Sequence, residues 1–321
     1  MPYGQNSDFG FIFQNSFDEV GDVGSIHFLP ILNESVSVKK PSLISESMRG
    51  IFEEGDSYEG PNTNDGDVEV EANAGALGLL LSCIFDETAT VTSGSVITRT
   101  FKPRSTDWDS ISAGRPFTVY KYMEVGSAMM FSNMNGSALE LMVTNGELLK
   151  SKLSVVGGSF SQIADTTASY PDDRIWSWDT SSVSFGGTAN ADVENLTIKV
   201  DEAIEALHTL NNSTTPSHTK HTGFRTLTVD GTIKFKDQDE YQQFLSQSER
   251  ELIVNFRGPT EIQSGYYPEL TVKVPKMRYD DFGPVLGGPG ETTVSFTARG
   301  KYSVDSAALL EITHVSTQSA Y

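Results

Sequence analysis

The chain has 321 residues, a hydrophobic share of 37% and a formal net charge of -20 at pH 7. This hydrophobic share supports packed cores in one large β domain or two ordinary domains, and it excludes wholesale disorder. The charge argues against a protein that grips nucleic acid, because phosphate binding needs clustered Lys and Arg. The acidity fits either a self-repelling soluble surface or a functional acidic face.

The first segment, residues 1–23, is aperiodic and contains Phe9, Phe11, Phe13 and Phe17. Its opening residues, MPYGQNSDFG, lack the basic region and the apolar core of a secretory signal. We interpret the segment as an N-terminal arm that either docks on a neighbouring molecule, with Phe11 and Phe13 as contact residues, or stays disordered.

Residues 46–65 form a long acidic loop, ESMRGIFEEGDSYEGPNTND. Loops of this length inside compact domains are usually functional or disordered. Apolar side chains in an acidic loop favour contact with a partner, although packing back onto the chain's own domain explains them equally well. We take Ile51, Phe52 and Tyr58 as candidate contact residues of this loop.

Two later stretches each combine an alternating strand with a capped helix. In residues 66–84, Val68 and Val70 alternate with acidic residues, and Asn73 can cap a helix. In residues 226–245, a long alternation ends at a capping box of Asp237 and Glu240. The two predicted helices present apolar faces of Leu77, Leu80, Leu81 and Ile84, and of Tyr241, Phe244 and Leu245. A weaker helical pattern covers residues 200–210, and residues 211–222 are predicted to form a loop.

These two stretches align with each other when Gly66 is placed on Gly231. After each helix comes an apolar run, at residues 96–101 and 252–256, and then an alternating strand, at residues 117–122 and 270–274. We therefore predict an internal duplication in a mainly β chain with few short helices. The predicted units are the arm at residues 1–23 and two tandem β-sandwich or barrel modules at residues 24–165 and 166–321, each flanked by a helix. The polar segment 159–173 contains the boundary between the modules.

No motif for catalysis, for a cofactor or for a metal stands out in the chain. His218 and His221 have metal-compatible spacing in HTKH, but we expect them to be solvated in a loop without a nearby carboxylate. The Trp-Asp pairs that begin at Trp108 and Trp178 could mark a sugar-binding cleft, yet packing in a core or interface explains them better.

Cys83 is the one cysteine of the chain, so no intrachain disulfide can form. Its place in the apolar stretch LLLSCIF predicts a packing role. The longest apolar run, residues 76–81, is too short to span a bilayer. We expect a soluble protein made in a reducing compartment, with no membrane partner.

Three stretches together resemble the bacteriophage tail tube proteins, also called major tail proteins. The first is IHFLPILNESVSVKKPSLISES, followed by the long acidic loop and GDVEVEANAGALGLLL. The second is LTVDGTIKFKDQDEYQQFL, and the third is PELTVKVPKMRYDDFGPVLGGPGETTVSFTARG. The order of these elements carries the resemblance, which covers residues 24–315.

This resemblance implies a structural virion protein that self-assembles, without catalysis and without a cofactor. In such proteins, inner strands of neighbouring subunits join into a continuous barrel, and long loops and terminal arms stack the rings. The implied partners are further copies of the chain, a tape measure protein and a tail terminator. Genomic DNA would pass through an acidic-lined conduit without specific binding. The implied location is the virion tail, with the host cytoplasm as the place of assembly.

Two modules in one chain favour trimeric rings with pseudo-sixfold symmetry, and hexameric rings are the alternative. Other functions stay open at this point. They are a different phage structural protein, such as a tail terminator or a decoration protein, a carbohydrate-binding or carbohydrate-active β-sandwich protein, and an adhesion module.

Overall fold

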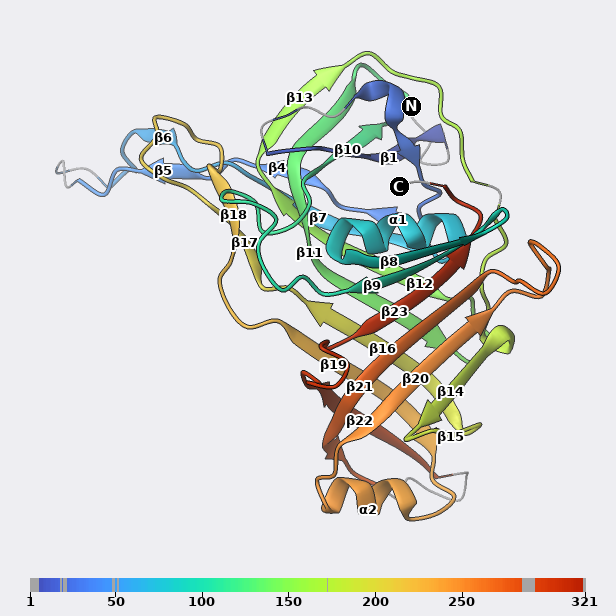
Figure 1. Ribbon diagram of the computed structural model, residues 1–321. Helices are drawn as coiled ribbons and strands as arrows, with labels where there is room; N and C mark the ends of the chain where they lie inside the picture. Colours follow the sequence, from blue (N-terminus) through green and yellow to red (C-terminus); the bar gives the residue numbers. More distant parts are fainter. Residues whose placement is uncertain are drawn as a thin grey trace.

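A computed structural model of the chain describes residues 6–17, 19, 22–47, 50, 52–171, 173–284 and 292–319. The described chain consists mainly of β-strands and contains two α-helices (Figure 1). This confirms the predicted mainly β fold with few short helices. No helix in the described ranges is long and apolar enough to cross a membrane.

The elements follow one another in two series along the chain. The first series comprises β1 (Asp8–Phe13), β2 (His27–Phe28), β3 (Asn33–Glu34), β4 (Ser37–Lys39), β5 (Ser42–Ile44), β6 (Ser57–Glu59), β7 (Thr63–Glu71), α1 (Ala74–Ile84), β8 (Asp86–Ser93), β9 (Val96–Lys102), β10 (Phe117–Tyr122), β11 (Ala128–Thr144), β12 (Lys150–Gly157) and β13 (Ser159–Ile163). The second comprises β14 (Ser181–Phe185), β15 (Thr188–Ala189), β16 (Val193–Asp201), β17 (Ile204–Leu207), β18 (His218–His221), β19 (Thr226–Lys234), α2 (Asp239–Leu245), β20 (Arg250–Arg257), β21 (Glu269–Phe282), β22 (Thr293–Gly300) and β23 (Glu311–Ser316).

An antiparallel set of strands runs through both series. Its order is β3 and β4 in one line, then β7, β12, β11, β16, β19, β22 and β21. We call these strands the ladder. β11 of the first series pairs with β16 of the second, so the ladder joins the two halves of the chain. Figure 1 shows α1 near both chain ends and α2 at the opposite end of the strands.

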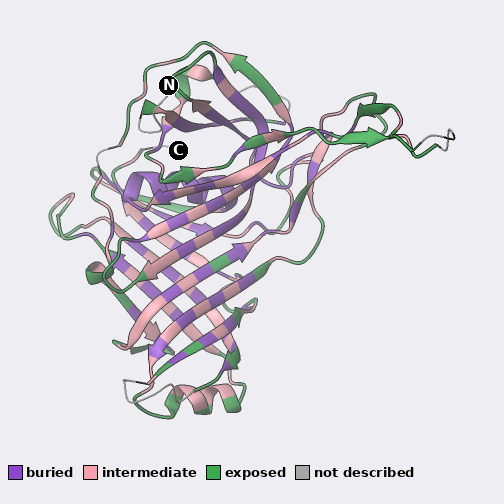
Figure 2. Cartoon of the chain, turned by 180° about the vertical axis from the view of Figure 1, so that it is seen from behind, coloured by how far each residue is buried: buried purple, intermediate pink, exposed green. Residues whose placement is uncertain are grey.

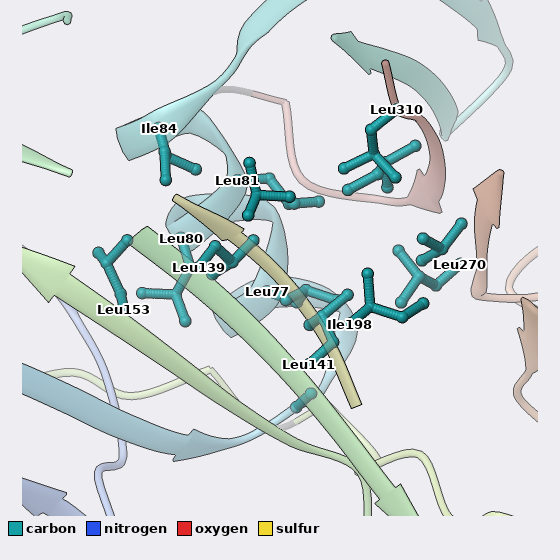
Figure 3. Packing of buried hydrophobic residues seen from close by; sticks show 14 of the residues in the cluster. Leu77, Leu80, Leu81, Ile84, Leu139, Leu141, Leu153, Ile198, Leu270 and Leu310 are labelled. Atoms are coloured by element: carbon teal, nitrogen blue, oxygen red, sulfur yellow. The ribbon is translucent and has the colours of Figure 1, made fainter. Parts of the chain in front are cut away.

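One face of the ladder forms the core because its strands alternate between apolar and polar residues. Val68, Leu139 and Leu153 are buried on this face, and Figure 2 shows the resulting bands of buried and intermediate residues along the strands. α1 packs its leucines, including Leu77 and Leu80, against the same face (Figure 3). Each fully buried leucine contributes about 1.5–3 kcal/mol. The opposite face of the ladder is polar, and we call it the wet face.

The two helices lie where the capped patterns predicted them. The side chain of Asn73 accepts a hydrogen bond from the Ala76 amide over 2.7 Å, which confirms the predicted cap of α1. α2 begins at Asp239, and the Asp237 carboxylate accepts a hydrogen bond from the Asp239 amide over 3.0 Å. The N-cap of α2 is therefore Gln238, one residue beyond the predicted Asp237.

The third predicted helix, residues 200–210, is wrong. These residues contain the end of β16 and the strand β17. Ala203 lies between them with φ of 50°, in the left-handed region, which separates the two strands. Apolar residues at Val200, Ile204 and Leu207 have helical spacing, but this spacing also arises when a turn separates two short strands.

The strand pairing of the first series recurs in the second. β10, β11, β12 and β7 pair in sequence, as do β20, β21, β22 and β19. β1 pairs with β10 and β2, and β14 pairs with β20 and β15. The hairpins β5–β6 and β17–β18 occupy equivalent places, before β7 and before β19. Among the described elements, the β8–β9 hairpin of the first series lacks an equivalent in the second.

The irregularities of this pairing recur as well. In the first series the register shifts between Phe117 and Val119 and between Gly136 and Ala138; in the second it shifts between Arg250 and Leu252 and between Tyr279 and Asp281. A bulge adds one unpaired residue at a defined place in a strand. The matching shifts of β11 and β21 therefore make Gly136 equivalent to Tyr279 and Ala138 equivalent to Asp281.

These equivalences change the alignment of the two halves. Because Gly136 pairs with Val155 and Tyr279 pairs with Ala298, the strands β12 and β22 also correspond residue by residue. β7 pairs with β12, and β19 pairs with β22, so these two strands also correspond. In this correspondence Gly231 is equivalent to Val68 and not to Gly66. The predicted alignment was wrong by two residues, a slip that keeps every side chain on the same face. The strand at residues 117–122 corresponds to β20, whereas residues 96–101 form β9.

The expected arm and the expected boundary segment both contribute strands. Residues 8–13 of the expected arm form β1, which pairs with β10, and residues 159–163 of the expected boundary form β13, which pairs with β11. The division into residues 1–23, 24–165 and 166–321 stays a prediction.

Candidate interaction surfaces

The hairpin of β5 and β6 projects from the sheets, as Figures 1 and 2 show. We call the described residues between 42 and 59 the projecting hairpin. Leu43 pairs with Tyr58 across it, and both side chains are exposed. Phe52 is fully exposed at its far end, while Ile51 lies outside the described residues. The structure therefore gives the predicted acidic loop a hairpin base and places Phe52 and Tyr58 on its surface.

The projecting hairpin is tied to the loop between β17 and β18. The Asn62 amide nitrogen of the backbone donates to the Thr214 carbonyl over 2.7 Å, and its side-chain amide donates to the Thr214 hydroxyl over 2.9 Å. His208 Nε2 lies 2.9 Å from the Asn62 carbonyl and donates to it. Leu210 in the same loop is fully exposed. Asn62, just after β6, thus holds the loop at the tip of the equivalent β17–β18 hairpin.

Phe11 and Phe13 lie elsewhere, on β1. Phe11 is buried and makes edge-to-face contacts with Phe9 and Phe117. Phe13 is half-buried beneath the guanidinium of Arg115, which lies 4.0 Å from the ring centroid. Both side chains pack within their own chain, away from the projecting hairpin.

The wet face of the ladder carries acidic and basic side chains in cross-strand pairs. Lys152 Nζ lies 2.9 Å from an Asp67 carboxylate oxygen, and the Ser154 hydroxyl donates to the same carboxylate over 2.6 Å. Partial burial opposes the ionisation of Asp67, but the hydrogen bonds from Ser154 and Lys152 hold its pKa below the usual value. The hydrogen bond to Asp67 raises the pKa of Lys152. Glu140 stands between Lys152 and Lys199 in the strand register.

The expectation that HTKH is a loop without a nearby carboxylate is wrong. Residues 218–221 form β18, and His221 Nδ1 lies 2.8 Å from an Asp107 oxygen. Its Nε2 lies 3.5 Å from Glu202, which is buried and also paired with Arg225. The hydrogen bond to Glu202 raises the pKa of His221, and that to Asp107 adds to the effect.

This ionic cluster ties the β17–β18 hairpin to residues 104–112, and its charges are mutually neutralised. Lys220 also binds Asp107 over 3.0 Å. Within the described ranges, no group of His, Cys, Asp and Glu side chains is arranged to hold a metal ion.

The two Trp-Asp pairs lie in different surroundings. Trp178 and Asp179 line an open groove of about 470 Å³ beside β14 and β16. Trp108 instead packs beneath Arg104, whose guanidinium carbon lies 4.9 Å from the ring centroid. The two tryptophans therefore do not face each other across this groove.

The ladder ends in two strand edges that the sequence did not predict. At one end, β3 and β4 pair with β7, and no other described strand pairs with their second edge. At the other end, Asp281 and Phe282 of β21 pair with β22, while β20 follows β21 only as far as Met277. Open edges of this kind are sites where another strand can pair. The short alternation SVSVK at residues 35–39 was the available sequence signal, but three paired residues are too few to distinguish an edge strand from a loop.

The comparisons with known proteins give one family. The family model described as phage tail tube protein matches residues 4–303 of the chain. No curated protein matches it at a significant level.

Proposed function

Because this chain belongs to the phage tail tube protein family, we propose that it self-assembles into stacked rings and that these form a conduit for the phage genome. The observation that carries this proposal is the ladder, a continuous sheet with one buried face, one polar face and two open edges. Such edges are satisfied when the strands of neighbouring copies pair. The proposed role is structural: the protein acts by assembling with copies of itself.

The recurrence of strand order and of register shifts supports a ring of pseudo-equivalent units. Each half of the chain contributes four positions to the ladder: β3/β4, β7, β12 and β11 in the first, and β16, β19, β22 and β21 in the second. Three chains would then give a closed ring with six similar units. We favour this trimeric ring, and a hexameric ring of chains is the alternative.

The wet face is the surface that would line the conduit. The opposite face is already buried by α1 and by other strands, so it cannot face a water-filled channel. Several basic side chains on the wet face are held by carboxylates: Lys39 by Asp65, Lys152 by Asp67 and Arg299 by Asp280. They are therefore poorly placed to grip phosphates, and the net charge of -20 repels DNA. DNA would pass without specific binding.

The projecting hairpin is suited to contacts between stacked rings. It extends from the body and exposes Phe52 and Tyr58 among acidic residues. A neighbouring ring would bury these side chains and remove apolar surface from water. A tape measure protein and a tail terminator are the other partners expected in the virion tail, and assembly would take place in the host cytoplasm.

Negative-stain microscopy of the purified protein tests this function. Tubes or stacks of rings, with threefold symmetry in end-on views, are the expected result. Single rings that never stack would indicate a tail terminator instead, and discrete monomers under every assembly condition would contradict the proposal. Mass spectrometry of isolated phage tails should independently identify this chain as an abundant tail component.

A further inference from the structure

The pairing between the two halves of the chain shows how one half can join the next in a continuous sheet. β11, which belongs to the first half, pairs with β16, which belongs to the second. The register of this seam runs from Ala138 opposite Asp201 and Leu139 opposite Val200 to Thr144 opposite Asn195. On the same edge of β11, the preceding residues pair with β10.

The equivalents of these two strands are β21 and β3/β4, and each lacks the partner that the seam supplies. β20 takes the place of β10 beside β21, but it ends opposite Met277. Beyond that point, Asp281 and Phe282 pair with β22 alone among the described strands. At the other end of the ladder, β4 takes the place of β16 and pairs with β7 alone among the described strands. The open edge of β21 is therefore equivalent to the edge of β11 that pairs with β16, and the open edge of β4 is equivalent to the edge of β16 that pairs with β11.

We propose that β21 of one copy pairs with β4 of the next copy in the register of the β11–β16 seam. This inference rests on the proposed ring assembly and specifies its contact. The matched bulges make Ala138 equivalent to Asp281 and Leu139 equivalent to Phe282.

The equivalents on β4 follow from the neighbouring strands. Val200 pairs with Leu227 of β19, whereas Val38 pairs with Asn64 of β7. Asn64 pairs with Gly157 of β12, which places it at the position of Leu227 in the second half. The seam then sets Asp281 of one copy opposite Lys39 of the next, and Phe282 opposite Val38.

The chemistry of these positions suits a second copy of this chain. Asp281 and Lys39 carry opposite charges, and both side chains are exposed on the wet face. Lys39 already pairs with Asp65 of β7 in its own chain, so a facing Asp281 would share this ammonium group. Phe282 is buried at the edge of the core, and Val38 is partly buried against the same core. A strand added here would extend the apolar layer on one face and form an ion pair on the other. The ladder would then continue from copy to copy.

Cysteine cross-linking tests the register. The variant Lys39→Cys with Asp281→Cys should form disulfides between chains in assembled rings, because directly opposed strand residues have Cβ atoms about 4.5–5.5 Å apart. Non-reducing electrophoresis should show dimers and trimers of the 35.0 kDa chain. The single variants are the controls and should give no such series. Cys83 is buried and serves as an internal reference.

A charge swap gives a second, independent readout. Asp281→Lys should lower the rate of ring formation at least several-fold, and Lys39→Asp in the same chain should restore most of it. Asp305→Lys, at an exposed turn outside the ladder, makes the same charge change and should assemble normally.

These experiments separate failure of the seam from failure of the proposed function. Tubes that form without cross-links between the paired cysteines, or cross-links confined to one chain, would overturn the seam and leave the tube intact. A wild-type chain that never forms rings would overturn the proposed function itself.

Discussion

His314 of β23 is buried against the first residue of α1. Its Nε2 donates a hydrogen bond to the Ala74 carbonyl over 2.8 Å, and the ring meets Trp176 edge-on. Burial lowers the pKa of His314 to about 4, from an ordinary value of 6.5. The folded protein therefore holds a neutral imidazole across a pH range in which the unfolded chain binds a proton.

The stability of the protein should therefore fall as the pH drops from about 6.5 to about 4. In this window the unfolded state binds more protons at residue 314 than the folded state does, so its free energy decreases. The full effect of His314 is about 3 kcal/mol, from the lowered pKa and about 1.4 kcal/mol per unit. Denaturant unfolding of the wild type and of His314→Gln, measured across this range, checks it. Curves that stay parallel for the two proteins would contradict the assignment.

Gly66 illustrates how a single residue sets the path of an element. A Cβ atom at this position would lie 2.5 Å from both the Cα and the backbone nitrogen of Val36, between β3 and β4. Because the colliding atoms belong to the backbone, no side-chain rotation relieves the contact. Close approach of β3 and β4 to β7 thus requires a glycine here.

The variant Gly66→Ala should displace β3 and β4 from the ladder. We expect a loss of about 1–3 kcal/mol in the free energy of unfolding and a larger loss of ring assembly, because the displaced strands form one proposed edge. Gly223→Ala is the control, since its Cβ would meet only the Ala203 Cβ at 3.6 Å. Thermal unfolding and microscopy of both variants measure the two effects. Normal tubes from Gly66→Ala would exclude a role for this edge.

At the scale of elements, the sequence predicted best where one strand or helix has a clear period. Val68 and Val70 in β7 and the cap at Asn73 were predictable because alternation and capping are local. The slip between Gly66 and Gly231 was not, because a shift of two residues preserves both patterns and only pairing with β12 and β22 resolves it. The position of the ladder edges was not predictable for the same reason, because it depends on which distant strands pair.

The residues of the candidate surfaces differ in the same way: some were predictable from local sequence, and others depend on contacts between distant segments. Phe52 and Tyr58 could be predicted from apolar residues in an acidic segment, whereas Phe11 belongs to a strand whose partner lies about a hundred residues away in sequence. The carboxylates around His221 were unpredictable because Asp107 and Glu202 come from two distant segments.

Phe52→Asp should leave the monomer folded and stop the growth of tubes. Phe52 is fully exposed, so the substitution removes no packing within the chain, but it places a charge in the proposed ring-to-ring contact. Circular dichroism should match the wild type, and microscopy should show rings without tubes. Tyr302→Asp, a similar change at an exposed aromatic residue outside the hairpin, should still give tubes. Wild-type tube yields from Phe52→Asp would remove the hairpin from the proposal.

For the whole molecule, net charge and the wet face act together. The chain is strongly acidic, and several basic side chains of the wet face are paired with carboxylates. A conduit needs both properties, because free lysines would bind passing phosphates and unpaired carboxylates would repel one another across the ring. The balance at Glu140 matters most, since it stands between Lys152 and Lys199 on adjacent strands.

Glu140→Lys should therefore make the proposed conduit retain DNA. The variant places three lysines side by side across β12, β11 and β16, and every copy in the ring repeats this row. Like charges at opposed strand positions cost about 0.2–1 kcal/mol per pair, which leaves folding and assembly largely intact. Assembled tubes of the variant should bind DNA with an affinity that falls steeply as salt is added, and particles carrying it should eject their genome more slowly. Glu261→Lys makes the same charge change in the loop between β20 and β21, outside the ladder. It should neither increase DNA binding by the tubes nor slow the ejection of the genome. Equal DNA binding by the two variants would show that the wet face does not line the conduit.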